Sequence, residues 1–93
     1  MVLELGQVVA TAGVDSWVKE ASPERRIAPL LCAVQRHARG DWGEVCSEDK
    51  LTNDEAVKHG NRVISAYTID AKKVWVITEC DRSVTTVLFP EEY

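Results

Sequence analysis

Polar side chains that could carry out acid–base or phosphate chemistry gather in two stretches of this sequence. One is the glycine-flanked segment His37–Gly43, and the other is the polar knuckle Glu79–Ser83, which lies between two runs of β-branched and aromatic residues. A histidine, an arginine and a hydroxyl can supply a general base, a cation for a phosphorane and a hydrogen bond, as in metal-independent ribonucleases. The sequence therefore permits a phosphodiester enzyme that uses His37, Arg82 and Thr85.

Carboxylates gather between these two stretches, which favours a different function. The formal net charge is −4, from 11 basic and 15 acidic residues, and this balance argues against a dedicated nucleic-acid binder. It permits an acidic surface offered to a basic partner. We predict a partner-binding surface made of Asp41, Trp42, Glu44, Glu48, Asp49, Asp54, Glu55, Glu79, Asp81 and Arg82. The alternative interpretation is structural, with the same groups capping turns, bracing loops and solvating a helix face.

The cysteines give no strong indication of a metal centre. Cys32, Cys46 and Cys80 show no CxxC spacing, and a zinc site at Cys32, His37 and Cys46 would lack the usual closely spaced ligand pairs. Cys32 lies in an apolar helical run, so we expect it in the core. There is no glycine-rich phosphate loop and no nucleophile elbow. We therefore predict no metal and no cofactor.

The C-terminal strands are the element that must position these groups. Val74–Thr78 and Val84–Phe89 read as two strands joined by the knuckle, and Arg62–Ile69 alternates clearly between two faces, with Val63, Ser65, Tyr67 and Ile69 together on one of them. Leu5–Thr11 is a shorter candidate strand. Strands of this kind need cover for their apolar face, which the preceding helices must provide.

Three helices are predicted before the strands. They are Val14–Glu20, Ile27–Arg39 and Ser47–His59; a Ser22–Arg25 start signal precedes the second, and Ser47 is the expected cap of the third. The second helix repeats apolar residues at Ile27, Leu30, Leu31 and Val34, which should pack on the sheet. We predict one α+β domain over residues 1–93, with about three helices on a three-stranded antiparallel meander. A fourth strand is added if Leu5–Thr11 joins it.

Several segments together resemble a family of small proteins on bacterial mobile elements. These segments are His37–Gly43, Glu48–Lys50, Asn53–Asp54, Arg62–Tyr67, Trp75–Glu79, Asp81–Ser83, Thr85–Thr86 and Leu88–Tyr93. Such proteins are labelled "plasmid-related protein" or "type I restriction endonuclease subunit M", and the resemblance spans about Leu5 to Tyr93. Because 93 residues are too few for a methyltransferase domain with its cofactor fold, the resemblance implies a habitat on plasmids, integrative elements or phages.

Size and patterning fix the expected compartment and complete the functional hypothesis. No apolar run approaches the roughly 20 residues that span a bilayer, and the first residues lack the pattern of a secretory signal, so we expect a cytoplasmic protein. We predict a small acidic, non-enzymatic accessory protein of a mobile element that binds and inhibits a host defence complex of the CRISPR or restriction kind. The expected partner is a host protein or nucleoprotein complex with a basic surface. We expect neither direct nucleic-acid binding nor a membrane.

Overall fold

A four-stranded mixed sheet forms the centre of the structure, a computed structural model that describes residues 3–93. The strands are β1 (Gln7–Ala10), β2 (Val63–Ile69), β3 (Lys72–Thr78) and β4 (Val84–Leu88), and their order in the sheet is β1-β4-β3-β2. β2, β3 and β4 form the antiparallel meander that was predicted. The N-terminal strand joins them as the fourth strand and runs parallel to β4, so the α+β prediction is confirmed.

The turn between β2 and β3 is tighter than expected. Asp70 and Ala71 both have positive φ, +50° and +63°, as in a two-residue hairpin turn whose twist matches that of the strands. β3 therefore begins at Lys72, two residues before the predicted Val74. The predicted face of β2 is confirmed, because Val63, Ser65, Tyr67 and Ile69 are all buried.

Three helices precede the meander: α1 (Ala12–Lys19), α2 (Ile27–Ala38) and α3 (Ser47–His59). α1 begins earlier than predicted because the Thr11 hydroxyl accepts a hydrogen bond from the backbone N–H of Val14 (3.3 Å) and caps the helix. Residues 23–26 form a turn and not a helix start. Cys46, not the predicted Ser47, occupies the cap position of α3.

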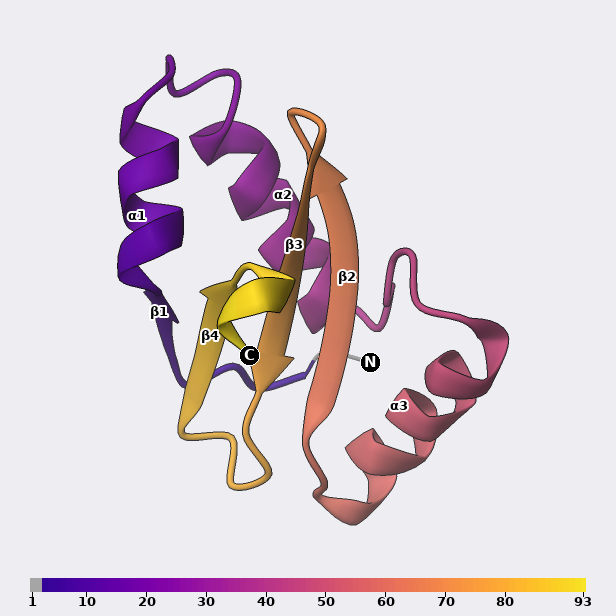
Figure 1. The fold of residues 1–93 in the computed structure, drawn as a ribbon. Helices are drawn as coiled ribbons and strands as arrows, with labels where there is room; N and C mark the ends of the chain where they lie inside the picture. The colour runs from indigo at the N-terminus through magenta and orange to yellow at the C-terminus, as the bar shows by residue number, and fades with distance from the viewer. Residues whose placement is uncertain (1–2) are drawn as a thin grey trace.

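The elements form layers around the sheet (Figure 1). α2 lies behind β2 and β3 in this view, α1 stands above β1 at the left of the sheet, the short 3₁₀ helix η1 (Pro90–Glu92) lies in front of the sheet, and α3 stands beside β2. The main core fills the space under α1 and α2 and contains Val14, Ala33, Tyr67, Val76 and Phe89, among others. A smaller core beneath α3 joins Leu3, Trp42, Ala56 and Val63.

The buried side of α2 differs from the predicted stripe. Leu30 and Val34 pack against the core as expected, but Leu31 is 60% exposed and Ile27 is 37% exposed. The buried positions of α2 are Ala33 and His37. Cys32 is exposed, so its prediction as a core residue is wrong. The helix is therefore rotated so that its histidine, and not its cysteine, faces the sheet.

The two edges of the sheet are treated differently. On the outer edge of β2, the Asn53 side chain of α3 donates to the Ile64 carbonyl (2.8 Å) and accepts from the Ile64 N–H (3.3 Å). The next outward residue, Ala66, donates to the Trp42 carbonyl (3.2 Å) and accepts from the Glu44 N–H (2.7 Å). At the other edge, β1 is exposed at all four residues and, within residues 3–93, pairs only with β4.

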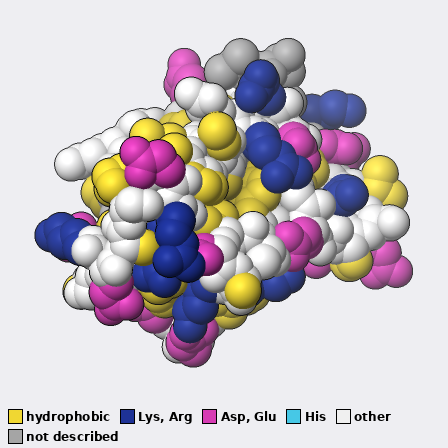
Figure 2. All heavy atoms as spheres, turned by 90° about the horizontal axis from the view of Figure 1, so that it is seen from above, with side chains coloured by type: hydrophobic (Ala, Val, Ile, Leu, Met, Phe, Trp, Pro, Cys, Tyr) yellow, Lys and Arg dark blue, Asp and Glu magenta, His cyan; other side chains and the backbone are white. Residues whose placement is uncertain are grey.

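The surface carries both signs of charge. Figure 2 shows, on the face seen from above, small groups of basic and acidic side chains separated by hydrophobic ones. A phosphate-binding surface would show a large block of basic side chains. The face in Figure 2 shows no such block. Across residues 3–93, no helix is both long and apolar enough to cross a membrane.

Candidate functional site

His37 lies at the centre of a buried polar network between α2 and the sheet. It is fully buried, and its Nδ1 shares a hydrogen bond with the hydroxyl of Ser65 while its Nε2 lies 2.8 Å from Thr78 Oγ1. The Thr78 and Thr85 hydroxyls are 2.7 Å apart, and Thr85 donates onward to the carbonyl of Leu5 (2.7 Å). Three strands and one helix are thereby joined by polar contacts that are mutually satisfied.

Burial controls the protonation of this histidine. Desolvation, assisted by the positive charge of Arg82, lowers the pKa of His37 from 6.5 to about 4, so the imidazole is neutral at physiological pH. Trp42 packs against its ring edge-to-face, with 5.6 Å between the centroids. A phosphodiester enzyme that used His37 as its base would first have to expose the imidazole, because a general base must reach the proton that it removes.

Arg82 holds the C-terminal end of α3. Its guanidinium donates to the carbonyls of Ala56 (3.0 Å) and Asn61 (2.7 Å) beyond the knuckle, and to that of Glu79 (3.2 Å) within it. Cations at this end of a helix complement its exposed carbonyls. Arg82 thus braces loops, as the structural interpretation of the sequence allowed, and its partners are backbone oxygens. Together with the contacts of Thr85, this gives the predicted catalytic set structural roles.

The tryptophan loop is tied to α3 and to α2. Trp42 is 3% exposed, and its indole N–H donates to Asp54 (2.9 Å) on α3. Asp41 accepts two hydrogen bonds from Arg36, and the Arg36 bond lowers the pKa of Asp41. The Tyr67 hydroxyl donates to the Asp41 carbonyl (2.6 Å), and burial raises the pKa of Tyr67 to about 12. Hydrogen bonds to α2, α3 and β2 therefore hold the loop in place.

The remaining predicted residues divide between α3 and the knuckle. Asp81 accepts hydrogen bonds from both the N–H and the hydroxyl of Ser83, which lower the pKa of Asp81 and close the knuckle. Glu79 is half-buried. Glu48, Asp49 and Glu55 are exposed on α3. α3 contacts the tryptophan loop through Asp54 and the knuckle through Arg82. Trp42 is buried, so it does not form part of an exposed surface.

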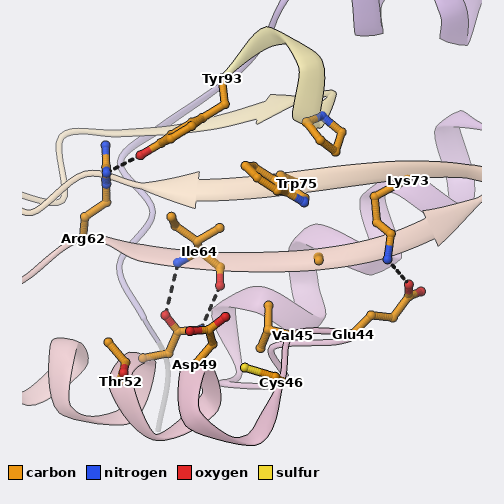
Figure 3. A pocket seen from close by; sticks show the side chains of 13 residues that line it. Glu44, Val45, Cys46, Asp49, Thr52, Arg62, Ile64, Lys73, Trp75 and Tyr93 are labelled. Carbon is orange, nitrogen blue, oxygen red and sulfur yellow. Dashed lines mark hydrogen bonds and ion pairs between the residues drawn. The ribbon is translucent and has the colours of Figure 1, made fainter.

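A groove of about 670 Å³ opens between α3 and the outer face of the sheet. Figure 3 shows Trp75 on the sheet side and Asp49 and Thr52 on the α3 side, with Ile64 between them. Tyr93, from the C-terminal end of the chain, meets the Trp75 ring edge-to-face at 5.6 Å. Of the residues predicted as partner-binding, only Glu44 and Asp49 line this groove.

Charged side chains mark the two ends of the groove (Figure 3). At one end, Arg62 donates a hydrogen bond to the Tyr93 hydroxyl, and its guanidinium lies 5.4 Å from the centre of that ring. At the other end, Lys73 pairs with Glu44 at 2.7 Å, and this contact, followed by the Thr68 hydroxyl, lowers the pKa of Glu44. Within residues 3–93, the Asp49 carboxylate has neither a hydrogen-bond partner nor an ion-pair partner.

Sequence reasoning missed the sheet side of the groove. Trp75 alternates with the buried Val74 and Val76, so the pattern did place it on the opposite face. A tryptophan on that face was a signal for a second contact surface. The contact between Arg62 and Tyr93 forms only because η1 brings the C-terminal residue back over the sheet. No group of three or more histidine, cysteine or acidic side chains within residues 3–93 is arranged to hold a metal ion.

Comparisons with protein-family models, with curated protein sequences and with solved structures gave no match to this chain. The function is therefore inferred from the groove and from the exposed face of α3. By fold and site, this is a small α+β protein with a helix-lined surface groove.

Proposed function

We propose that this chain is a small non-enzymatic binding protein that offers α3 to a basic surface of a partner. The observation that carries the proposal is the position of Leu51, which is 66% exposed on α3. Glu48, Asp54 and Glu55 lie three or four positions from it and share its side of the helix. An exposed leucine surrounded by carboxylates combines an apolar contact with charge selection, which is how protein interfaces join affinity to specificity.

The way α3 is attached supports the same proposal. The only buried residues of the helix are Asn53 and Ala56, so little of it contributes to a core. Four acidic and two basic side chains give the helix a balance of −2 (2 − 4), with His59 neutral. Polar contacts from Asn53, Trp42 and Arg82 hold it in place. A helix held in this way presents a rigid outer face, which reduces the entropy lost on binding.

The class of partner follows from the resemblance to small proteins of mobile elements. Plasmids and phages meet restriction and CRISPR complexes, whose nucleic-acid grooves are basic. An acidic face with a central apolar contact could occupy such a groove in place of nucleic acid. We therefore propose inhibition of a host defence complex as the function, with α3 as the contact element.

Plasmid interference in living cells tests this function. A plasmid with target sites is introduced into hosts that carry either an active type I restriction system or a CRISPR effector, with and without this protein. We expect the protein to raise plasmid recovery in one of the two hosts. The purified protein should also bind the corresponding purified complex. Unchanged recovery in both hosts would contradict the proposal.

The double variant Glu48→Lys/Leu51→Ser tests the contact face. We expect it to abolish inhibition and binding. Glu24→Lys/Leu31→Ser is the matched control, since Leu31 is a leucine of similar exposure on α2 (60%) and Glu24 is an exposed acid. Circular dichroism should show that both variants fold. Equal loss in the two variants would show a general charge effect and overturn the assignment to α3.

A further inference from the structure

The groove beside α3 combines an aromatic side with a carboxylate that has no partner of its own within residues 3–93. At one end Glu44 and Lys73 neutralise each other, and at the other end Arg62 is held against the Tyr93 ring and has no acidic partner among the described residues. Asp49 lines the opposite side with no partner of its own among the described residues. The Asp49 carboxylate, across from a half-buried tryptophan, is therefore a negative charge open to a cationic side chain of a partner.

The structure already uses guanidinium–aromatic contacts at this and other places. Arg62 lies 5.4 Å from the Tyr93 ring centre, Arg26 lies 4.7 Å from that of Trp17 and Arg36 lies 4.9 Å from that of Tyr67. A planar guanidinium can stack on an indole and at the same time donate two parallel hydrogen bonds to a carboxylate, whereas an ammonium is a compact and strongly hydrated charge. The chemistry of the groove therefore favours arginine over lysine.

The backbone around the groove excludes another mode of binding. The outward polar groups of Ile64 are held by Asn53, and those of Ala66 are held by Trp42 and Glu44. A partner segment cannot add as a further strand at these positions, because the edge has no free donors or acceptors to offer. Recognition must then come from a side chain that enters the groove from above.

We propose that the groove binds an arginine side chain of the basic partner, stacked on Trp75 and paired with Asp49. The aliphatic part of this arginine would lie on Ile64 and Val45, which line the same groove. This inference rests on the proposed function, because it specifies how a basic partner is recognised. It adds a second contact beside the Leu51 face, on the side of α3 that faces the sheet.

NMR titration with capped pentapeptides tests the assignment. The peptides carry arginine, lysine or the neutral analogue citrulline between glycines. We expect the arginine peptide to shift the indole N–H signal of Trp75, which a Trp75→Phe variant assigns among the three tryptophans, and to bind more tightly than the other two. Equal binding of the lysine or citrulline peptide would overturn the proposal.

Asp49→Asn and Glu24→Gln form a matched pair of variants. Both remove one exposed carboxylate, but only Asp49 lines the groove, and Glu24 lies outside α3. We expect Asp49→Asn to weaken binding of the arginine peptide about tenfold, as the loss of a charge-assisted hydrogen bond does, and Glu24→Gln to leave it unchanged. Equal effects of the two variants would overturn the proposal.

Two further results separate this inference from the function on which it rests. Plasmid protection that persists in Asp49→Asn while arginine binding is absent from the wild type would overturn the groove assignment alone. Arginine binding that depends on Asp49, in a protein that protects no plasmid, would overturn the defence function alone. Self-association abolished by Asp49→Asn would assign the groove to a second copy of the chain and overturn the proposal.

Discussion

The side-chain amide of Asn53 satisfies both backbone groups of Ile64, donating to its carbonyl at 2.8 Å and accepting from its N–H at 3.3 Å. One residue of α3 therefore takes the place that a neighbouring strand would occupy. It closes the β2 edge and fixes the helix that carries the proposed contact face.

Asn53→Ala should destabilise the protein by about 2 kcal/mol, because two backbone groups lose their partners at a site that is otherwise covered. Urea unfolding measures this change, and hydrogen exchange at the Ile64 amide should accelerate. Thr52→Ala is the control, since the Thr52 hydroxyl bonds only to the Glu48 carbonyl within α3. If Thr52→Ala lowered the free energy of unfolding as much as Asn53→Ala, this account would be contradicted.

The stability of the fold should decrease with acidification. The pKa of His37 is about 4 in the folded state and its ordinary value is 6.5, so between these values the unfolded state binds more protons. The contribution of the neutral His37 to the free energy of unfolding is fully present above about pH 6.5. It is lost as the pH falls to about 4, a total of about 3 kcal/mol.

Urea unfolding at a series of pH values tests this slope. His59→Gln removes the exposed histidine and should leave the slope in place, while NMR titration of the His37 ring in the folded protein should show a midpoint near pH 4. A midpoint above 6 would contradict the prediction.

Two glycines with nearly the same backbone conformation should respond differently to alanine. Gly43 has φ +72° and Gly60 has φ +71°, so each substitution costs about 1–2 kcal/mol from the left-handed conformation alone. A Cβ at Gly60 would meet open space, but one at Gly43 would overlap the Ala66 carbonyl and the Tyr67 ring. Gly43→Ala should therefore lower the melting temperature much more than Gly60→Ala. Equal shifts would show that the Trp42 loop tolerates displacement.

Arg82→Lys should loosen the end of α3 although it keeps the charge. Lysine cannot donate to the carbonyls of Ala56, Asn61 and Glu79 in the forked geometry of a guanidinium. We expect a loss of about 1 kcal/mol in urea unfolding, with faster hydrogen exchange in the last turn of α3. Lys58→Arg, on the exposed surface of the same turn, should change neither quantity.

Local patterns predicted the elements, and tertiary contacts decided their partners. The alternation of Val63, Ser65, Tyr67 and Ile69 assigned the buried face of β2 correctly, because a two-residue period leaves only two choices. The predicted buried face of α2 was rotated by part of a turn from the observed one, since Leu31 is exposed and His37 is buried. A sequence pattern ranks histidine as polar and could not indicate that Ser65 and Thr78 would satisfy it.

The groove was harder to predict than the fold. Glu44 and Asp49 were recognised as candidate binding residues from their charge. Trp75 and Tyr93 were not, because their contact joins β3 to the chain end through the geometry of η1. Composition could indicate an acidic surface, whereas pairing Asp49 with an aromatic ring required the position of α3 beside β2.

The unequal edges of the sheet limit how copies of this chain could combine. Because Asn53 and the Trp42 loop hold the outward backbone groups of Ile64 and Ala66, β1, where Val8 and Val9 are exposed, is the more open of the two margins of the described sheet for intermolecular pairing. A molecule with one such margin can recruit a single neighbour, and the pair then has none left. Edge-to-edge growth would therefore terminate at a dimer and could not propagate into a fibril.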